Sequence, residues 1–177
     1  FIVPGFIDSH LHFLTGGFNL ASVQLRDAAS KEEFISRIGE YATTLKPGTW
    51  IQGGDWDHTL WGGELPSKEW IDAVTPKHPV FINRLDGHMS LSNSLAMKLA
   101  GVDKRTKDVE GGEIVRNSAG EPTGIFKENA TGLVEKVIPP PTAEQTDKAL
   151  VAAMNYVASK GVTSVHHMVG HMDALER

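Results

Sequence analysis

Apolar residues occur along the chain in short runs that alternate with stretches of helical spacing. The runs predict buried strands at residues 1–13, 50–54, 79–83 and 162–165. Between the first two runs, apolar side chains in residues 34–45 recur every three or four positions, which predicts an amphipathic helix. Ser30 with Glu33, and Thr142 with Gln145, form capping boxes that typically open a helix. A second long helix is therefore expected after Thr142.

Weaker patterns complete the expected order of elements. They predict a β-hairpin, two shorter helices and a loop, at residues 113–126, 95–100, 130–138 and 16–17. Alternation of strands and helices is typical of an α/β fold with parallel strands and helical crossovers. A closed eight-stranded barrel usually takes about 250 residues. We therefore expect residues 1–177 to form a single partial barrel domain whose pattern begins and ends inside the fold.

Composition and charge narrow the class of protein. The 177 residues are 40% hydrophobic and 22% charged, with a net charge of −5. No basic stripe is present, so nucleic-acid binding is not expected. No apolar run approaches the about 20 residues of a membrane helix. The absence of cysteine excludes disulfides and thiolate metal sites and fits a reducing compartment. We expect a cytoplasmic protein that binds neither nucleic acid nor membranes.

Two histidines end the first apolar run and are the first candidates for chemistry. If residues 6–13 form a strand, Asp8, His10 and His12 point to the same face. Two imidazoles about 7 Å apart along a strand can converge on one metal ion. Neutral imidazole is the commonest metal ligand, whereas a buried pair without a partner is unfavourable. A metal site and a hydrogen-bonded structural pair both remain open from spacing alone.

Polar residues also follow two later strands. Asp86 and His88 come just after the strand at 79–83, where the active site of a barrel is built, so they could orient a substrate. A turn and helix cap is the alternative for Asp86. Trp56 lies in a polar, aromatic loop and could wall a substrate pocket or simply pack. No phosphate-binding glycine loop and no serine-hydrolase elbow are present.

Several segments together resemble one known family. Residues 4–12, Pro-Gly-Phe-Ile-Asp-Ser-His-Leu-His, are similar to the first-strand signature of the amidohydrolase superfamily, whose members are metal-dependent hydrolases on a (β/α)8 barrel. Further segments resemble the amidohydrolase family 3 branch, which includes N-substituted formamide deformylase-like proteins. They are residues 86–88, 93–94, 111–114, 122–128 and 161–165. The resemblance covers nearly the whole chain and implies about the first half of a TIM-type barrel with a β-hairpin insertion.

The resemblance implies a set of metal ligands. His10 and His12 would bind the more buried ion, and a middle strand would supply an acidic or carboxylated-lysine ligand. Lys127 and Glu128 compete for that position, because alternation prevents both from facing the interior. The resemblance to this branch favours Glu128 as the ligand, and a carboxylated Lys127 is the alternative. A surface Lys–Glu pair without a role in metal binding is the third possibility. One or two divalent ions, most simply Zn²⁺, would activate water for hydrolysis of an amide-type C–N bond.

The same resemblance implies that part of the site lies outside this chain. Two further histidines and the aspartate general base are expected beyond Arg177, so no catalytic base is assigned here. His166 and His167 stand near a position where relatives often carry aspartate, and their role is open. The predicted partner is a small-molecule substrate, and uncovered edge strands favour a homo-oligomer. The alternative function is a catalytically incomplete α/β domain with a structural or interaction role.

Overall fold

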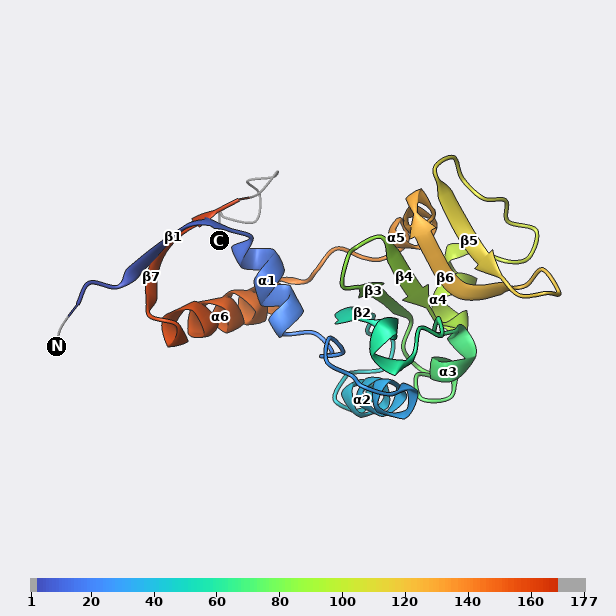
Figure 1. The fold of residues 1–177 in the computed structure, drawn as a ribbon, viewed down its shortest axis with the longest axis horizontal. Helices are drawn as coiled ribbons and strands as arrows, with labels where there is room; N and C mark the ends of the chain where they lie inside the picture. The colour runs from blue at the N-terminus through green and yellow to red at the C-terminus, as the bar shows by residue number, and fades with distance from the viewer. Residues whose placement is uncertain (1–2, 169–177) are drawn as a thin grey trace. The chain divides into compact units, whose positions relative to one another are not determined.

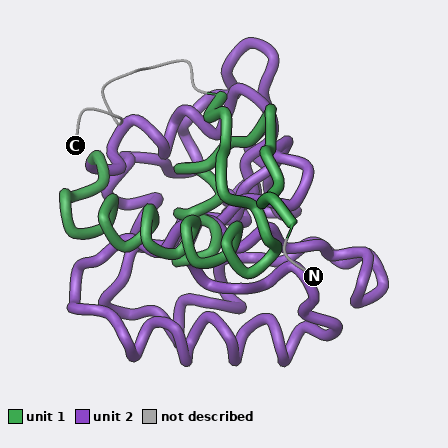
Figure 2. Tube along the Cα trace, turned by 90° about the vertical axis from the view of Figure 1, so that its left-hand side faces the viewer, with its two compact units in different colours: residues 1–21, 140–177 green, residues 22–139 purple. Residues whose placement is uncertain are grey.

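The computed structural model describes residues 3–168 and divides the chain into two compact units. Unit 1 comprises residues 1–21 and 140–177, and unit 2 comprises residues 22–139 (Figure 2). The N-terminal and C-terminal segments thus belong to the same unit, and the central segment forms the other. The single domain expected over residues 1–177 stays a prediction, and each unit is described by itself.

Unit 1 contains two strands and two helices. They are β1 (Phe6–Leu11), α1 (Phe13–Leu20), α6 (Ala143–Ser159) and β7 (Val162–His167) (Figure 1). β1 and β7 pair in parallel as a two-stranded sheet. The two helices pack closely because a glycine, Gly17, faces the backbone of α6 at Ala149. The capping box predicted at Thr142 is confirmed, with reciprocal bonds to Gln145.

Two predictions for the N-terminal segment were wrong. Residues 1–13 do not form a buried strand: β1 ends at Leu11, and its Phe6 and Ile7 side chains are 69% and 68% exposed. β7 is the one strand paired with β1 in the described part of the chain, so an apolar run gave an exposed strand. Gly16 and Gly17 are not a loop but lie inside α1, where Gly17 permits the close helix contact.

Unit 2 is built on a five-stranded sheet with the strand order β2-β3-β4-β6-β5. Its strands are β2 (Ile51–Trp56), β3 (Val80–Arg84), β4 (Met89–Ser92), β5 (Gly112–Arg116) and β6 (Pro122–Glu128). Its α-helices are α2 (Lys31–Thr43), α3 (Lys68–Asp72), α4 (Ser94–Ala100) and α5 (Gly132–Glu135), with 3₁₀ turns at His58–Trp61 and Asn129–Thr131. Ser30 caps α2 through a bond from the Glu33 backbone N–H, as predicted, while the Glu33 carboxylate accepts from the Ala29 backbone N–H in place of that of Ser30.

The sheet of unit 2 has more antiparallel pairs than the one hairpin that the sequence predicted among parallel strands. β2 and β3 are parallel, but the β3–β4, β4–β6 and β5–β6 pairs are antiparallel. The difference comes from β4, a short strand that the sequence analysis missed between Asp86 and Asn93. The chain reverses there after only four residues, too few for the helical crossover that a parallel strand needs. The predicted hairpin is confirmed as β5 and β6.

Two apolar clusters fill unit 2. One gathers Phe34, Trp56 and Ile82 with neighbouring aliphatic side chains, and the other contains Phe81 and Phe126. Phe81 and Ile82 are adjacent on β3 and point to opposite faces, so β3 carries a cluster on each face. Burial of one such side chain contributes about 1.5–3 kcal/mol. β3 therefore has apolar packing on both faces, and the polar residues at its end have a firm base.

Candidate functional site

The histidine pair lies where β1 gives way to α1. Asp8 and His10 are on β1, and His12 is the residue that precedes the first turn of α1. The Asp8 carboxylate accepts a hydrogen bond from the His10 backbone N–H at 3.0 Å. The rings of His10 and His12 lie edge to face, with centroids 5.8 Å apart. The strand end therefore brings both imidazoles to one exposed place.

One ring nitrogen of His12 is already engaged. Its Nδ1 lies 3.0 Å from the backbone carbonyl oxygen of Met168, just after β7. A carbonyl oxygen can only accept, so Nδ1 carries the proton and Nε2 keeps its lone pair. A backbone carbonyl that fixes the tautomer of an imidazole is the usual support of a metal-ligating histidine. His12 is thus held in the tautomer that can bind a metal through Nε2.

His167 plays a different part in the same unit. Its Nδ1 accepts a hydrogen bond from the backbone N–H of Phe13 at 3.0 Å, which satisfies one of the free donors at the start of α1. Its Nε2 is buried and has no hydrogen-bond partner in the described part of the chain. His166, by contrast, is exposed. The structure therefore gives His167 a capping role, and a metal role for either residue stays a prediction.

A bulge at the end of β2 turns the Trp56 side chain into the core of unit 2. The register to β3 shifts between Gly53 and Trp56, and Gly53, Gly54 and Asp55 all have positive φ angles. Strict alternation would place Ile51 and Trp56 on opposite faces, but the bulge buries both. The Trp56 indole N–H donates to the Ile82 carbonyl at 3.0 Å inside the core. Its complete burial is that of a core residue and gives no support to the predicted substrate wall.

Arg84, at the end of β3, gathers the polar residues that follow β2 and β3. Its guanidinium donates to the Asp86 carboxylate, to Asp57 Oδ1 at 3.3 Å and, through Nε, to His58 Nδ1 at 3.2 Å. Partial burial alone would raise the pKa of Asp86, but the hydrogen bond from the His88 backbone N–H and the charge of Arg84 lower it below its usual value. Asp86 therefore stays ionised beside Arg84.

The pKa of the Asp57 carboxyl is set in the same way. Burial alone would raise it, but the Thr59 backbone N–H and the positive charge of Arg84 lower it overall. Asp57 Oδ1 accepts from that N–H at 3.1 Å, which caps the 3₁₀ turn His58–Trp61. Two ionised carboxylates thus lie on one guanidinium, so the cluster is a network of charge-assisted hydrogen bonds with one negative charge in excess.

Glu128 and His88 meet at the ends of β6 and the β3–β4 turn. His88 Nδ1 lies 3.1 Å from Glu128 Oε2, and this hydrogen bond raises the pKa of the His88 imidazole. Lys127 turns away, and its ammonium donates to Glu113 at 2.9 Å. Glu128 has a φ of 49°; it and Asp55 are the two non-glycine residues with positive φ among the described residues. Such backbone strain is concentrated at functional sites.

The predicted site residues thus fall into two groups. His10 and His12 belong to unit 1, whereas Asp86, His88 and Glu128 belong to unit 2. Within residues 3–168, no three His, Asp or Glu side chains are arranged to hold a metal ion. Sequence reasoning missed Arg84, although its position was a signal, since a charged residue directly after a buried strand was the criterion that selected Asp86.

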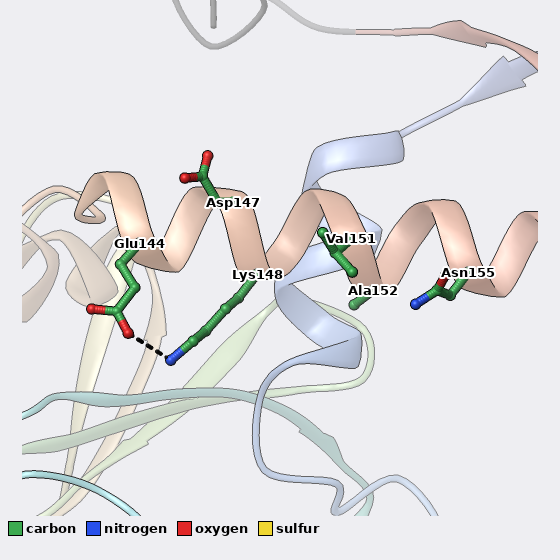
Figure 3. Close-up of a pocket in the computed structure, with 6 residues that line it drawn as sticks. All are labelled: Glu144, Asp147, Lys148, Val151, Ala152 and Asn155. Carbon is green, nitrogen blue, oxygen red and sulfur yellow. Dashed lines mark hydrogen bonds and ion pairs between the residues drawn. The ribbon is translucent and has the colours of Figure 1, made fainter.

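One pocket contains none of the predicted site residues. All of its lining side chains come from α6, namely Glu144, Asp147, Lys148, Val151, Ala152 and Asn155 (Figure 3). Lys148 is engaged in an ion pair with Glu144 at 2.8 Å. Because a single helix supplies the whole lining, the pocket is one face of α6, and no histidine lies in it.

Comparisons with known proteins identify the family. The sequence matches the model described as the amidohydrolase family over residues 1–177. Protein LONG AFTER FAR-RED 3 of Arabidopsis thaliana is 44% identical, in a match that covers 93% of this chain and 28% of that protein. N-substituted formamide deformylase of Arthrobacter pascens is 31% identical over 93% of this chain and 32% of its own length. The chain belongs to the amidohydrolase family.

A solved structure places the chain in the fold of this family. An uncharacterized metal-dependent hydrolase from Pyrococcus horikoshii OT3 matches with a TM-score of 0.69 and 30% identity. The match covers 97% of this amidohydrolase-family chain and 32% of the solved one. The predicted α/β class and the resemblance are thereby confirmed, and the chain spans about a third of its relatives. In the described residues, no helix combines the length and the apolar character needed to cross a membrane.

Proposed function

We propose that this chain contributes to the active site of a metal-dependent hydrolase that cleaves an amide-type C–N bond of a small molecule. Membership in the amidohydrolase family and the structural likeness to a metal-dependent hydrolase support the class of reaction. The observation that carries the proposal is the ligand-competent state of His12, whose Nδ1 is held by the Met168 carbonyl beside the His10 ring.

The residues present fit a divalent cation, and zinc is the ion that we propose. Neutral imidazole nitrogen and carboxylate oxygen are its common ligands in proteins. His10 and His12 would hold the ion, and Glu128 would be the third ligand. Lys127 is the weaker candidate, because its ammonium is paired with Glu113. When bound, the cation would lower the pKa of water and polarise the carbonyl group of the substrate.

The remaining polar residues of unit 2 would bind and orient the substrate. The Asp86 carboxylate accepts the His88 backbone N–H and so fixes the turn that carries the His88 side chain. The His88 ring is largely exposed, and when the ring is protonated it can donate to a substrate oxygen from Nε2 while Nδ1–H stays on Glu128. Asp86 would thus fix the backbone of the turn, and His88 would contact the substrate. The general base is not assigned to this chain.

A zinc titration tests the proposal. Purified chain 1–177 should bind Zn²⁺ in isothermal titration calorimetry. His10→Ala combined with His12→Ala should weaken binding more than about tenfold, because removal of a group that only hydrogen-bonds a metal ligand already lowers metal affinity about 10- to 100-fold. Glu128→Gln should weaken it as well. His166→Ala, which removes an exposed histidine of the same unit, is the matched control and should bind as the unchanged chain does.

Two results would contradict the proposal. Unchanged zinc affinity in the double histidine variant would remove His10 and His12 as ligands. Absence of zinc binding by the unchanged chain, at zinc concentrations that saturate a full-length relative of the family, would favour the alternative of a catalytically incomplete domain with an interaction role. Loss of binding in His166→Ala alone would transfer the ligand role to β7.

A further inference from the structure

The cluster around Arg84 contains a histidine that the proposed function does not use. His58 begins the 3₁₀ turn after β2, and its ring packs edge to face against the buried Trp56 at a centroid distance of 5.9 Å. Its side chain is largely buried, as is that of Arg84, which is 17% exposed. Both ring position and ring orientation are therefore fixed by contacts within unit 2.

The contact with Arg84 determines where the proton of neutral His58 lies. Arg84 Nε carries a hydrogen and can only donate, and its acceptor at 3.2 Å is His58 Nδ1. Because a guanidinium is always protonated in proteins, Nδ1 of His58 must present its lone pair. The proton of the neutral ring is then on Nε2, which makes no hydrogen bond among the described residues and is not a buried unpaired atom. His58 therefore presents a hydrogen-bond donor.

We propose that Arg84 is a positioning residue that fixes His58 as a hydrogen-bond donor for an oxygen atom of the substrate, next to the turn that carries Asp86 and His88. The assignment of that oxygen to a substrate rests on the proposed function, whereas the donor state of His58 does not. A donor fixed in this way favours substrates with a carbonyl or carboxylate oxygen and gives no lone pair to a metal ion.

The shape of the guanidinium is essential to this role. Its planar fork reaches the Asp57 and Asp86 carboxylates through its two terminal nitrogens while Nε remains for His58. A lysine ammonium could keep the charge beside the two carboxylates, but it lacks the separate Nε–H that lies against the imidazole. Arg84→Lys should therefore keep the ion pairs but no longer fix the proton of the neutral His58 ring on Nε2.

Nitrogen-15 NMR of the histidine rings in chain 1–177 tests the proposal. At about pH 8, where an ordinary imidazole is neutral, His58 should be in the Nε2–H tautomer, with a hydrogen-bond coupling from Arg84 Nε–H to its Nδ1. In Arg84→Lys the ring should become a mixture of tautomers, and the share of Nε2–H should fall at least about tenfold relative to Nδ1–H, as about 1.4 kcal/mol would produce.

Arg116→Lys is the matched control. Arg116 lies in the same unit, is similarly covered at 24% exposure, and joins Asp108 to the backbone of residues 106 and 114. This variant should lower stability without altering the His58 tautomer. An equal change in both variants would reduce Arg84 to a general structural role and overturn the proposal.

The unchanged chain alone provides a second test in case Arg84→Lys does not fold. If His58 of the unchanged chain is in the Nδ1–H tautomer, the bond from Arg84 does not exist and the proposal fails. These spectra require no metal, so their outcome is separate from the zinc titration. Absence of zinc binding with an intact His58 tautomer would defeat the proposed function and leave standing only the donor state that Arg84 gives His58.

Discussion

The two units support their polar residues in very different ways. Every one of the largest fully buried side chains belongs to unit 2, including Trp56, Phe34 and Phe126. Most of the exposed large apolar side chains of the described residues lie in unit 1, among them Phe6 and Ile7. The Arg84 cluster, which comprises Arg84, Asp57, His58 and Asp86, therefore lies at the end of a sheet with apolar packing on both faces. The histidine pair, His10 and His12, lies at the end of a two-stranded sheet with little apolar packing.

This difference separates two ways of holding a functional side chain. In unit 2 the side chains are fixed by one another, since Arg84 bonds Asp57, His58 and Asp86. In unit 1 the ligand state of His12 depends on one bond from its ring to a backbone carbonyl across the end of β7. Local opening should therefore release the histidine pair at a lower free energy than it releases the Arg84 cluster. Substitutions that target one unit can test this ordering.

The largest effect is expected from Gly124→Ala in unit 2. Gly124 lies on β6 with a φ of 100°, and an added Cβ would stand 2.4 Å from the Ser92 backbone oxygen on neighbouring β4. The backbone angle and the steric overlap both oppose the substitution, so the free energy of unfolding should fall by about 3–5 kcal/mol. Urea denaturation followed by tryptophan fluorescence measures this change.

Gly120→Ala is the control for Gly124→Ala. Gly120 also has a positive φ, of 78°, but nothing lies within 4 Å of an added Cβ. The loss should then be the cost of the left-handed backbone alone, about 1–2 kcal/mol. Equal losses in the two variants would show that β4 and β6 are not packed as closely as the structure has them.

A smaller loss is expected from Asn93→Ala, which removes the N-cap of α4. Asn93 Oδ1 accepts from the backbone N–H groups of Ala96 and Val80, and Nδ2 donates to Thr75 and to the His78 carbonyl. All four bonds are buried, and the partners left unpaired should lower the free energy of unfolding by about 3 kcal/mol. Thermal unfolding and urea denaturation should agree on this loss.

The N-cap of α6 in unit 1 offers the contrast. Thr142 caps α6 through an exposed box with Gln145, and water can replace its bonds. Thr142→Ala should therefore reduce the stability of that helix by only about 1 kcal/mol. If this variant proves as damaging as Asn93→Ala, burial does not distinguish the two caps, and the comparison between the units loses one of its supports.

Sequence reasoning predicted local features that depend on near neighbours. The N-cap at Ser30, the capping box at Thr142, the hairpin of β5 and β6, and the strand beginning at Val162 are all confirmed. The family resemblance was confirmed as well, because the motifs are contiguous in the sequence. Roles assigned to single site residues stay predictions, and those residues belong to two separate units.

The misses arose where a distant contact decided the outcome. An apolar run predicted burial for β1, but burial depends on what covers a strand, and Phe6 and Ile7 are exposed. For Trp56 the sequence left a substrate wall and plain packing open, and the β2 bulge that buries it could not be predicted from the polar loop around it. Arg84 was overlooked because its significance lies in three partners that are two to 27 residues away.

The last comparison concerns the helix contact that holds unit 1 together. Gly17 of α1 lies so close to α6 that an added Cβ would stand 2.2 Å from the Ala149 backbone oxygen. Backbone cannot yield as a flexible side chain can, so Gly17→Ala should separate the helices and destabilise unit 1 by about 2 kcal/mol. Amide hydrogen exchange should then become faster in α1 and α6 and remain unchanged in the sheet of unit 2.

Gly16→Ala is the matched control in the same helix. No atom lies within 4 Å of its added Cβ, and alanine favours the helix over glycine by about 0.5–1 kcal/mol, so exchange in α1 should slow slightly. Opposite effects from two adjacent glycines would establish that close packing, and not helix propensity, limits unit 1. If Gly17→Ala instead accelerates exchange throughout unit 2 as well, the units unfold together, and the histidine pair shares the stability of the Arg84 cluster.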